Sequence, residues 1–465
     1  MTNPFFKLKP KYNQKELKVK INAFDCFKII YPKFDKVFFL ESLGEKSSFS
    51  RFSYIGFDPK LHIKANNSKL YFGKKIIRTG NPYKLLAKYF PTYTLPKTGF
   101  CGGLVGYISH EGTKYFEEAF ETQKHPDFYD FEFGLYQDGL IFDRFLNKVF
   151  YFSNDEKLDR SRMILELIKK RKNFPSKISF KFLGLNKTKP EYRTMIKKAL
   201  VEINRGNIFQ VVLSLKFLYQ IAGNKLKLYE VLRQINPSPY MFYFKFGPRD
   251  IFAASPELLI NVEGKKIKHF GTLAGTIKRG KNKEEDKYLA KKLQNDEKEK
   301  AEHMMLVDLA RNDMGRVCQP GTIKIKNLLG VKKFSHVQHL STEIYGKLKR
   351  GENIFSALKA CFPAGTLSGA PKIEAMKIIR RLEEEPRGPY GGVGGYFSFN
   401  GSCMLTINIR SMYISKNKGV AQVGSGIVYD SKPEKEYQEI LRKGQAMKEV
   451  LEKMAKPAFA KASAR

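Results

Sequence analysis

The sequence predicts an α+β fold, in which antiparallel strands are combined with helices. Residues 1–175 contain short apolar β-like segments such as KVFFLES and RFSYIGF, with one helical stretch near 156–172. From Glu191 onward, helical stretches alternate with apolar β-like runs such as FQVVLSLKFLYQI and CMLTINIRSMYI. A hydrophobic content of 42%, with 38 Phe and 24 Tyr, excludes a mainly disordered chain.

A change in composition predicts where the chain divides. The segment 173–190, NFPSKISFKFLGLNKTKP, is rich in turn-forming residues and has no helical period. We therefore expect an amino-terminal region over 1–175 and a second region over 190–452. The last residues, 453–465, are small and basic, which predicts a disordered tail.

The chain is strongly basic, with a formal net charge of +38. A nucleic-acid-binding protein is one interpretation, but the basic residues are spread along the chain and mixed with acids, so we expect a solvated surface and no nucleic-acid partner. No apolar run is long enough to cross a membrane, and none resembles a secretory signal. The five scattered cysteines predict thiols in a reducing cytoplasm.

Two predicted helices each carry a pair of carboxylates. The first is expected as one helix over residues 284–315, where Glu299 and Glu302 share a face. The second begins with a predicted capping box of Ser431 and Glu434. Its own acidic pair is Glu436 and Glu439. Together the pairs could bind a magnesium ion, although acid pairs on a solvated helix are common and the spacing alone leaves both interpretations open.

Three segments rich in small residues are candidates for close contact with a ligand. Residues 365–369, GTLSG, lead to Pro371 and a predicted helix, whose first amides could hold an anion. PRGPYGGVGGYFSF enters a strand, and VGSGIVYD precedes the second acidic helix. Each segment is equally compatible with an ordinary turn.

The segments AEHMMLVDLARNDMGRV, GTLSGAPK, PYGGVGGYF and GSGIVYDSKPEKEYQE occur in this order, and together they resemble the family of chorismate-using enzymes. The resemblance extends from about Phe38 to Lys448. It implies two large, mainly antiparallel β-sheets packed as a sandwich and flanked by helices. It also implies an active-site cleft in the carboxyl-terminal half.

The same resemblance implies roles for individual residues. Glu302 and Glu439 correspond to magnesium ligands, with Glu299 and Glu436 beside them. The positions that correspond to chorismate-binding residues are Gly275, Thr276, Tyr390, Arg410, Gly424, Ser425, Gly426 and Lys443. His339 and Thr366 correspond to catalytic residues near the reacting ring. An arginine suits this substrate, because a guanidinium can bind a carboxylate with two hydrogen bonds.

Two positions help to choose among members of the family. Members that add water to chorismate, isochorismate and salicylate synthases, carry a lysine base where this chain has Gln210, and an amide cannot deprotonate water. Many aminodeoxychorismate synthases carry a nucleophilic lysine where this chain has Ala274. The resemblance therefore favours anthranilate synthase component I, a lyase, with aminodeoxychorismate synthase component I as the alternative. Thr272 departs from the proline usual in that loop.

The amino-terminal half resembles anthranilate synthase component I as well. Glu41 and Ser42, together with Pro239, Tyr240 and Met241, correspond to a tryptophan feedback site. None of the five cysteines has the sequence context of a glutamine amidotransferase nucleophile. The resemblance thus implies a hetero-oligomer with a glutamine amidotransferase subunit (anthranilate synthase component II) that supplies ammonia.

Overall fold

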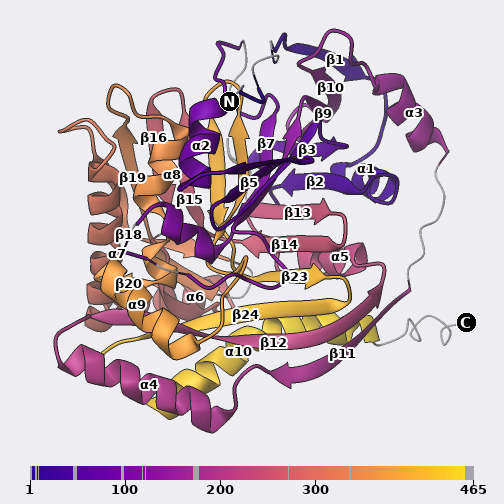
Figure 1. Cartoon of the computed structure of the whole chain (residues 1–465). Coiled ribbons are helices and arrows are strands. Elements are labelled where there is room, and N and C mark those ends of the chain that lie inside the picture. Colours follow the sequence, from indigo (N-terminus) through magenta and orange to yellow (C-terminus); the bar gives the residue numbers. More distant parts are fainter. Residues whose placement is uncertain are drawn as a thin grey trace, which may run out of the picture.

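A computed structural model of the chain shows two large β-sheets with helices around them (Figure 1). It describes residues 3–5, 8, 10–44, 50–95, 99–117, 119–120, 122–170, 177–270, 272–334 and 337–455. Of the predicted tail over 453–465, residues 453–455 belong to the last helix and 456–465 lie outside the described residues. No helix among the described residues is both long enough and apolar enough to span a bilayer.

The first sheet has twelve strands in the described part of the chain. In spatial order they are β1 (Asn13–Leu17), β10 (Lys148–Ser153), β9 (Asp138–Asp143), β3 (Phe52–Phe57), β2 (Lys36–Glu41), β13 (Tyr240–Phe246), β14 (Arg249–Ser255), β23 (Ser411–Ser415), β24 (Lys418–Ile427), β12 (Gln210–Gly223) and β11 (Ile178–Leu185), with β20 (Gly369–Ala370) paired to β12. Figure 1 shows this sheet from β1 at the top to β11 at the bottom.

The second sheet also has twelve described strands. In spatial order they are β17 (Ala274–Lys278), β19 (Val337–Lys347), β16 (Lys266–Phe270), β15 (Leu258–Glu263), β22 (Cys403–Ile407), β21 (Val393–Ser398), β7 (Gly103–Ile108), β8 (Phe131–Tyr136), β4 (Leu61–Asn66), β5 (Lys69–Phe72) and β6 (Lys75–Arg78), with β18 (Lys324–Lys333) paired to β19. The strand pairs recorded in both sheets are antiparallel.

Helices pack against both sheets. They are α1 (Ala23–Ile30), α2 (Pro82–Tyr89), α3 (Ser161–Lys169), α4 (Lys189–Asn204), α5 (Leu226–Ile235), α6 (Lys283–Asn295), α7 (Glu297–Gly315), α8 (Ile354–Cys361), α9 (Lys372–Glu383) and α10 (Pro433–Ala455), with 3-10 helices η2 (His110–Tyr115) and η3 (Gly365–Leu367). In Figure 1, α4 and α10 lie at the lower end of the first sheet, and α10 contacts β24.

The two sheets pack face to face around an aromatic core. Phe38 of the first sheet meets Tyr136 of the second edge to face, with ring centroids 4.6 Å apart. A buried ion pair also joins the sheets, because Arg249 on β14 donates through Nε to Glu132 on β8 over 2.9 Å. A second apolar cluster fills the space between the first sheet and helices α1, α4, α5 and α9. The predicted α+β sandwich flanked by helices is confirmed.

Both sheets contain strands from each of the two predicted regions. In the first sheet, β2 pairs with β13, and Glu41 lies directly opposite Met241. In the second sheet, β7 pairs with β21. The division near residue 175 stays a prediction, and residues 171–176 lie outside the described part of the chain. Wherever the division lies, the two regions share both sheets and the core between them.

The helix predicted over residues 284–315 is in fact two helices, so this prediction is wrong. The chain breaks at Asp296, whose backbone is extended with φ −74° and ψ 114°. Its carboxylate accepts a hydrogen bond from the Glu299 amide at 3.1 Å, which caps the start of α7. An acidic N-cap residue does not interrupt the helical spacing of apolar residues, so the break at Asp296 could not be seen from that spacing.

The predicted capping box at the start of α10 does not form. Ser431 Oγ donates to Glu436 Oε1 over 2.9 Å. Glu434 instead forms an ion pair with Lys189 on α4, with Nζ and Oε1 2.7 Å apart. Glu434 is thereby drawn away from the helix start. The long-range ion pair with α4 replaces the local reciprocal bond.

Candidate active site

Helices α7 and α10 bring their carboxylates to one place. Burial is the main cause that raises the pKa values of Glu299 and Glu302, and nearby acids add to it. For both groups one of these acids is Glu439 on α10. Residues that are some 140 positions apart in the sequence therefore form a single electrostatic cluster.

Basic and polar groups hold the acids of α10 in place. Lys443 makes an ion pair with Glu439 at 2.6 Å and donates to the Gly424 carbonyl at 3.1 Å. Glu436 accepts hydrogen bonds from the hydroxyls of Ser425 and Ser431. The end of β24 and the start of α10 are thus fixed to each other.

The carboxylates fit a magnesium ion that takes its remaining ligands from outside the chain. Across the part of the chain that the structure describes, no group of three or more His, Cys, Asp or Glu side chains is arranged to hold a metal. Magnesium is commonly bound by one or two carboxylates and keeps several waters. A cation between Glu302 and Glu439 would also relieve the repulsion that raises the pKa of Glu302. The donor set therefore suits this ion.

His339 on β19 is neutral and has a defined tautomer. Its Nδ1 lies 2.8 Å from the Gly275 carbonyl, and the Thr276 hydroxyl is 3.1 Å from the same nitrogen. A carbonyl only accepts, so Nδ1 carries the proton and Nε2 keeps a lone pair. Burial, followed by the charge of Arg410, lowers the pKa of His339 to about 4. The ring can therefore accept a proton through Nε2.

Glu257 is a candidate site residue that the sequence analysis missed. It follows β14 and is 3% exposed, and its Oε1 accepts a hydrogen bond from the Thr366 hydroxyl at 2.9 Å. Burial raises its pKa to about 7, against the opposing effects of Thr366 and Arg410. The available signal was a lone acid between two apolar runs, FAASPELLINV. A carboxyl there must be buried or lie in a turn, and buried carboxyls with shifted pKa values are typical of active sites.

Arg410 lies in the short connection between β22 and β23, with its backbone in the left-handed region at φ +49°. Burial lowers the pKa of its guanidinium, and the charge of Glu257 partly offsets this effect. The guanidinium lies 5.8 Å from the centre of the Phe334 ring. A partly desolvated arginine in this position is suited to bind an anion.

The glycines of β24 make room for neighbouring side chains. A Cβ on Gly424 would lie 2.7 Å from the Tyr390 hydroxyl, and a Cβ on Gly426 would lie 2.6 Å from Nε2 of Gln210. Gln210 donates from Nε2 to Glu302 Oε1 at 3.1 Å. Its Oε1 is buried and has no hydrogen-bond partner among the described residues. The amide is thus aimed at the acidic cluster and keeps one acceptor for a ligand.

Thr272 takes part in the strand packing beside the site. Its hydroxyl is buried and donates to the Thr342 carbonyl on β19 at 2.7 Å. Threonine at this position, where proline is usual, therefore ties the segment before β17 to β19. Ala274, two residues later, is also buried and offers no functional group.

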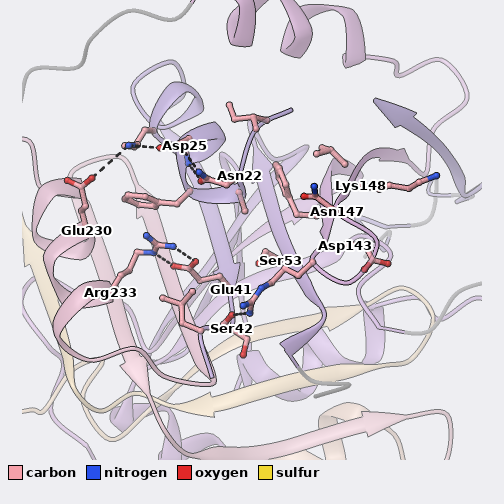
Figure 2. Close-up of a pocket in the computed structure, with 18 of the residues that line it drawn as sticks. Asn22, Asp25, Glu41, Ser42, Ser53, Asp143, Asn147, Lys148, Glu230 and Arg233 are labelled. Carbon is pink, nitrogen blue, oxygen red and sulfur yellow. Dashed lines mark hydrogen bonds and ion pairs between the residues drawn. The ribbon is translucent and has the colours of Figure 1, made fainter. Parts of the chain in front are cut away.

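Away from these residues, the amino-terminal region and helix α5 together line a cavity of about 440 Å³, shown in Figure 2. Glu41 and Ser42 of the predicted tryptophan site line it, together with Asp25, Arg144 and Arg233. Pro239, Tyr240 and Met241 are not among its described lining residues, although Met241 lies opposite Glu41 in the sheet.

Glu41 is already paired within this cavity. Arg233 on α5 donates two hydrogen bonds to the Glu41 carboxylate, one of them at 2.9 Å (Figure 2). Tyr229 adds a third hydrogen bond at 2.7 Å. Ser42 Oγ is buried without a partner among the residues that the structure describes. Of Glu41 and Ser42, it is therefore the Ser42 hydroxyl that is left to hydrogen-bond a ligand.

Comparisons with known proteins match nearly the whole chain. A model of the chorismate binding enzyme family matches residues 35–449. Anthranilate synthase component 1 of Leptospira biflexa is 41% identical over 447 residues, which cover 96% of each chain. The enzyme of the same name from Methanothermobacter thermautotrophicus is 42% identical, with 92% of each chain covered.

A solved structure shows the same fold. The crystal structure of anthranilate synthase component I from Streptococcus pneumoniae has a TM-score of 0.77 and 32% identity, and the match covers 86% of this chain and 93% of that one. The family match extends through the acidic helices, the glycine-rich strand β24 and the segment of Arg410. From the fold, the site and these matches together, the chain belongs to the chorismate binding enzyme family.

Proposed function

We propose that the protein is the large subunit of anthranilate synthase, the first committed enzyme of tryptophan biosynthesis. Chorismate and ammonia would give anthranilate, pyruvate and water. The observation that carries this proposal is Gln210, which occupies the site without an amine or any other base. An amide cannot activate water, but its unpartnered Oε1 can accept a hydrogen bond from ammonia.

The first step forms a carbon–nitrogen bond while the ring hydroxyl leaves. Arg410 binds a substrate carboxylate, and Glu257 gives its proton to the departing hydroxyl, which leaves as water. The ammonium formed on the ring then returns one proton to the Glu257 carboxylate, so the intermediate is an amine and Glu257 is again protonated. Arg410 favours the carboxylate that Glu257 becomes, since its charge acts to lower the pKa of that group.

The second step eliminates pyruvate and makes the ring aromatic. Nε2 of His339 removes the proton from the ring carbon that bears the amino group. The bond to the enolpyruvyl oxygen breaks, and the same proton completes the methyl group of pyruvate. His339 is ready for this role because its pKa of about 4 keeps the ring neutral.

Glu302 and Glu439 would hold Mg²⁺, with Glu299 and Glu436 beside them. When bound, the ion would neutralise a carboxylate of chorismate and help to place the ring. Lys443 already links Glu439 to the Gly424 carbonyl, so it fixes the direction of one ligand.

Ammonia would come from a glutamine amidotransferase subunit in a hetero-oligomer. The numbered component in the names of the relatives supports a partner. All five cysteines are buried, so none is placed to serve as a nucleophile for glutamine. Buried thiols are also compatible with a reducing cytoplasm.

The cavity beside Glu41 and Ser42 would bind tryptophan as a feedback inhibitor. It combines apolar walls, including Phe24 and Phe142, with both acidic and basic groups. An amino acid with an aromatic side chain needs these features. Ser42 Oγ offers an unused hydrogen bond, and Arg144 is a cation for the ligand's carboxylate.

Product analysis tests the proposal directly. The purified chain is incubated with chorismate, Mg²⁺ and ammonium at alkaline pH, and in parallel with glutamine in place of ammonium. We expect anthranilate from ammonium and none from glutamine. A 4-amino product would establish the aminodeoxychorismate alternative, isochorismate or salicylate would contradict the role of Gln210, and activity with glutamine alone would contradict the two-subunit model.

A further inference from the structure

A buried ion pair lies behind the candidate site. Arg387 is only 1% exposed, although it is among the largest side chains in the molecule. Its guanidinium donates to both carboxylate oxygens of Glu383 on α9, at 2.7 and 2.6 Å. Glu383 also accepts hydrogen bonds from the amide and the hydroxyl of Ser214 on β12, at 2.8 and 2.7 Å. A bidentate ion pair whose carboxylate also accepts further hydrogen bonds is held in one geometry.

The other guanidinium bonds of Arg387 reach two further segments. Nη1 donates to the Leu367 carbonyl and Nη2 to the Val212 carbonyl, each at 2.7 Å. Leu367 directly follows Thr366, and Val212 is two residues after Gln210 on β12. One side chain thus joins α9, η3 and β12 immediately beside two residues that face the site.

Glu111, from the amino-terminal region, holds the backbone of the same segment. It is 3% exposed, and its two oxygens accept hydrogen bonds from the amides of Arg387 at 2.7 Å and Gly388 at 2.9 Å. These amides begin the segment that leads to Tyr390, whose hydroxyl lies against Gly424. No hydrogen bond recorded for Glu111 in the described residues reaches the candidate site itself, so any effect on the site passes through this segment.

We propose that Glu111 and Arg387 are positioning residues for the chemistry at this site. Glu111 holds the segment of Tyr390, and Arg387 holds the carbonyl next to Thr366, so that the Thr366 hydroxyl meets Glu257. The reaction that they serve is the one proposed above, but the positioning itself rests on the hydrogen bonds alone. Misplacement of reacting groups by about 1 Å can slow a reaction roughly 100-fold.

Glu111→Gln is the principal test variant. Glutamine offers one oxygen and one amino group, so one of the two backbone amides loses its acceptor and faces a donor. We expect kcat for chorismate consumption to fall by about ten- to a hundredfold, with a smaller change in KM. Chorismate consumption is followed by absorbance, so the readout does not depend on which product forms.

Asp138→Asn provides a matched control. Asp138 is 2% exposed and accepts hydrogen bonds from the Tyr151 hydroxyl at 2.7 Å and from Nε of Arg160 at 2.8 Å. Neither partner lies in the candidate site or on η2, which carries Glu111, so this variant should lose stability while its folded fraction keeps kcat. An equal loss of kcat in the two variants would show a general effect of buried carboxyls and overturn the proposal.

Arg387→Lys tests the second residue with its charge retained. A lysine can pair with Glu383 but has a single nitrogen, which cannot reach both the Leu367 and Val212 carbonyls with the geometry of a guanidinium. We expect kcat to fall at least as far as in Glu111→Gln. Where Arg387→Lys does not fold, Glu111→Gln decides the question.

Hydrogen exchange separates this proposal from the proposed function. In Glu111→Gln, amides in residues 386–392 should exchange faster than in the wild type, and in Asp138→Asn they should not. This result is expected even if the wild type consumes no chorismate, an outcome that would contradict the proposed function only. Unchanged exchange in residues 386–392, or unchanged kcat in an active enzyme, would overturn the positioning roles.

Discussion

The hydroxyl of Thr366 donates to the carboxyl of Glu257 across 2.9 Å, although the two residues are 109 positions apart. Thr366 lies in a short 3-10 helix, and Glu257 lies between two buried strands. The charge of this carboxyl also acts on Tyr390, and the charge of Arg410 opposes the burial that raises the pKa of Glu257. We therefore expect Glu257, with its hydrogen bond from Thr366, to set the pH dependence of the enzyme.

We expect turnover to fall as the pH rises through about 7, when the free ammonia concentration is held constant. The pKa of Glu257 is raised to about 7, so the proton that it donates is present below this pH and lost above it. Glu257→Gln should lower kcat about 100- to 10,000-fold and remove this decline. An unchanged decline in Glu257→Gln would assign the titration to another group.

Thr366→Val should move the same decline to higher pH. The hydroxyl stabilises the ionised carboxylate, so its loss raises the pKa of Glu257 further. Measurement of kcat/KM from pH 5 to pH 9 checks the direction. A shift to lower pH would contradict the assigned hydrogen bond.

Glu302→Gln and Glu439→Gln should each abolish turnover and leave the fold intact. A neutral amide is a poorer magnesium ligand than a carboxylate. Calorimetric titration of Mg²⁺ and circular dichroism measure the two effects separately. Glu434→Gln, on the same helix but paired with Lys189, is the control and should behave as the wild type.

Full activity in Glu302→Gln or Glu439→Gln would remove that residue from the metal site. Chelation of the wild type should reproduce the loss, and added Mg²⁺ should reverse it. Loss of activity in Glu434→Gln as well would indicate a general effect of acidic residues on α10.

Tryptophan should bind the wild type and inhibit it at a site separate from chorismate. Ser42→Phe places a ring where the unpartnered hydroxyl lies, and Met241→Thr alters the residue opposite Glu41. Both variants should keep activity and lose inhibition. Calorimetry and initial rates give the result, and the coupling between two sites must be reciprocal, so chorismate should weaken tryptophan binding. No binding at millimolar tryptophan would contradict the feedback site.

Glu132→Ala should destabilise the fold by about 3–5 kcal/mol, because it leaves the Arg249 charge without its carboxylate between the two sheets. Replacement of both residues by apolar ones should cost less. Chemical denaturation measures the free energy of unfolding. Glu16→Ala, which breaks a surface pair with Lys148, should change it by only about 0–1 kcal/mol.

Local sequence patterns predicted strands and helices well where periodicity was strong. They failed at Asp296, because an acidic N-cap fits inside a continuous helical pattern. They also failed at Ser431 and Glu434, where an ion pair with Lys189 competes with the local cap. Both errors arise from contacts that a single helix does not contain.

The candidate site was predicted only where a motif marked it. Glu302, Glu439 and Arg410 were named from such motifs, and α7 and α10 do bring the two acids together. Glu257 was missed because its chemistry depends on burial and on Thr366, which is far away in the sequence. Arg387 was missed for the same reason, since its partners come from three separate segments.

The sharing of both sheets between early and late strands has a consequence for biosynthesis. Residue 41 pairs with residue 241, and residue 105 pairs with residue 396. The amino-terminal strands therefore leave the ribosome with unpaired edges and must wait for most of the chain to be made. Long-range pairing of this kind slows folding and exposes strand edges to aggregation. Newly made chains should accordingly depend on chaperones until β24 has emerged and the first sheet is complete.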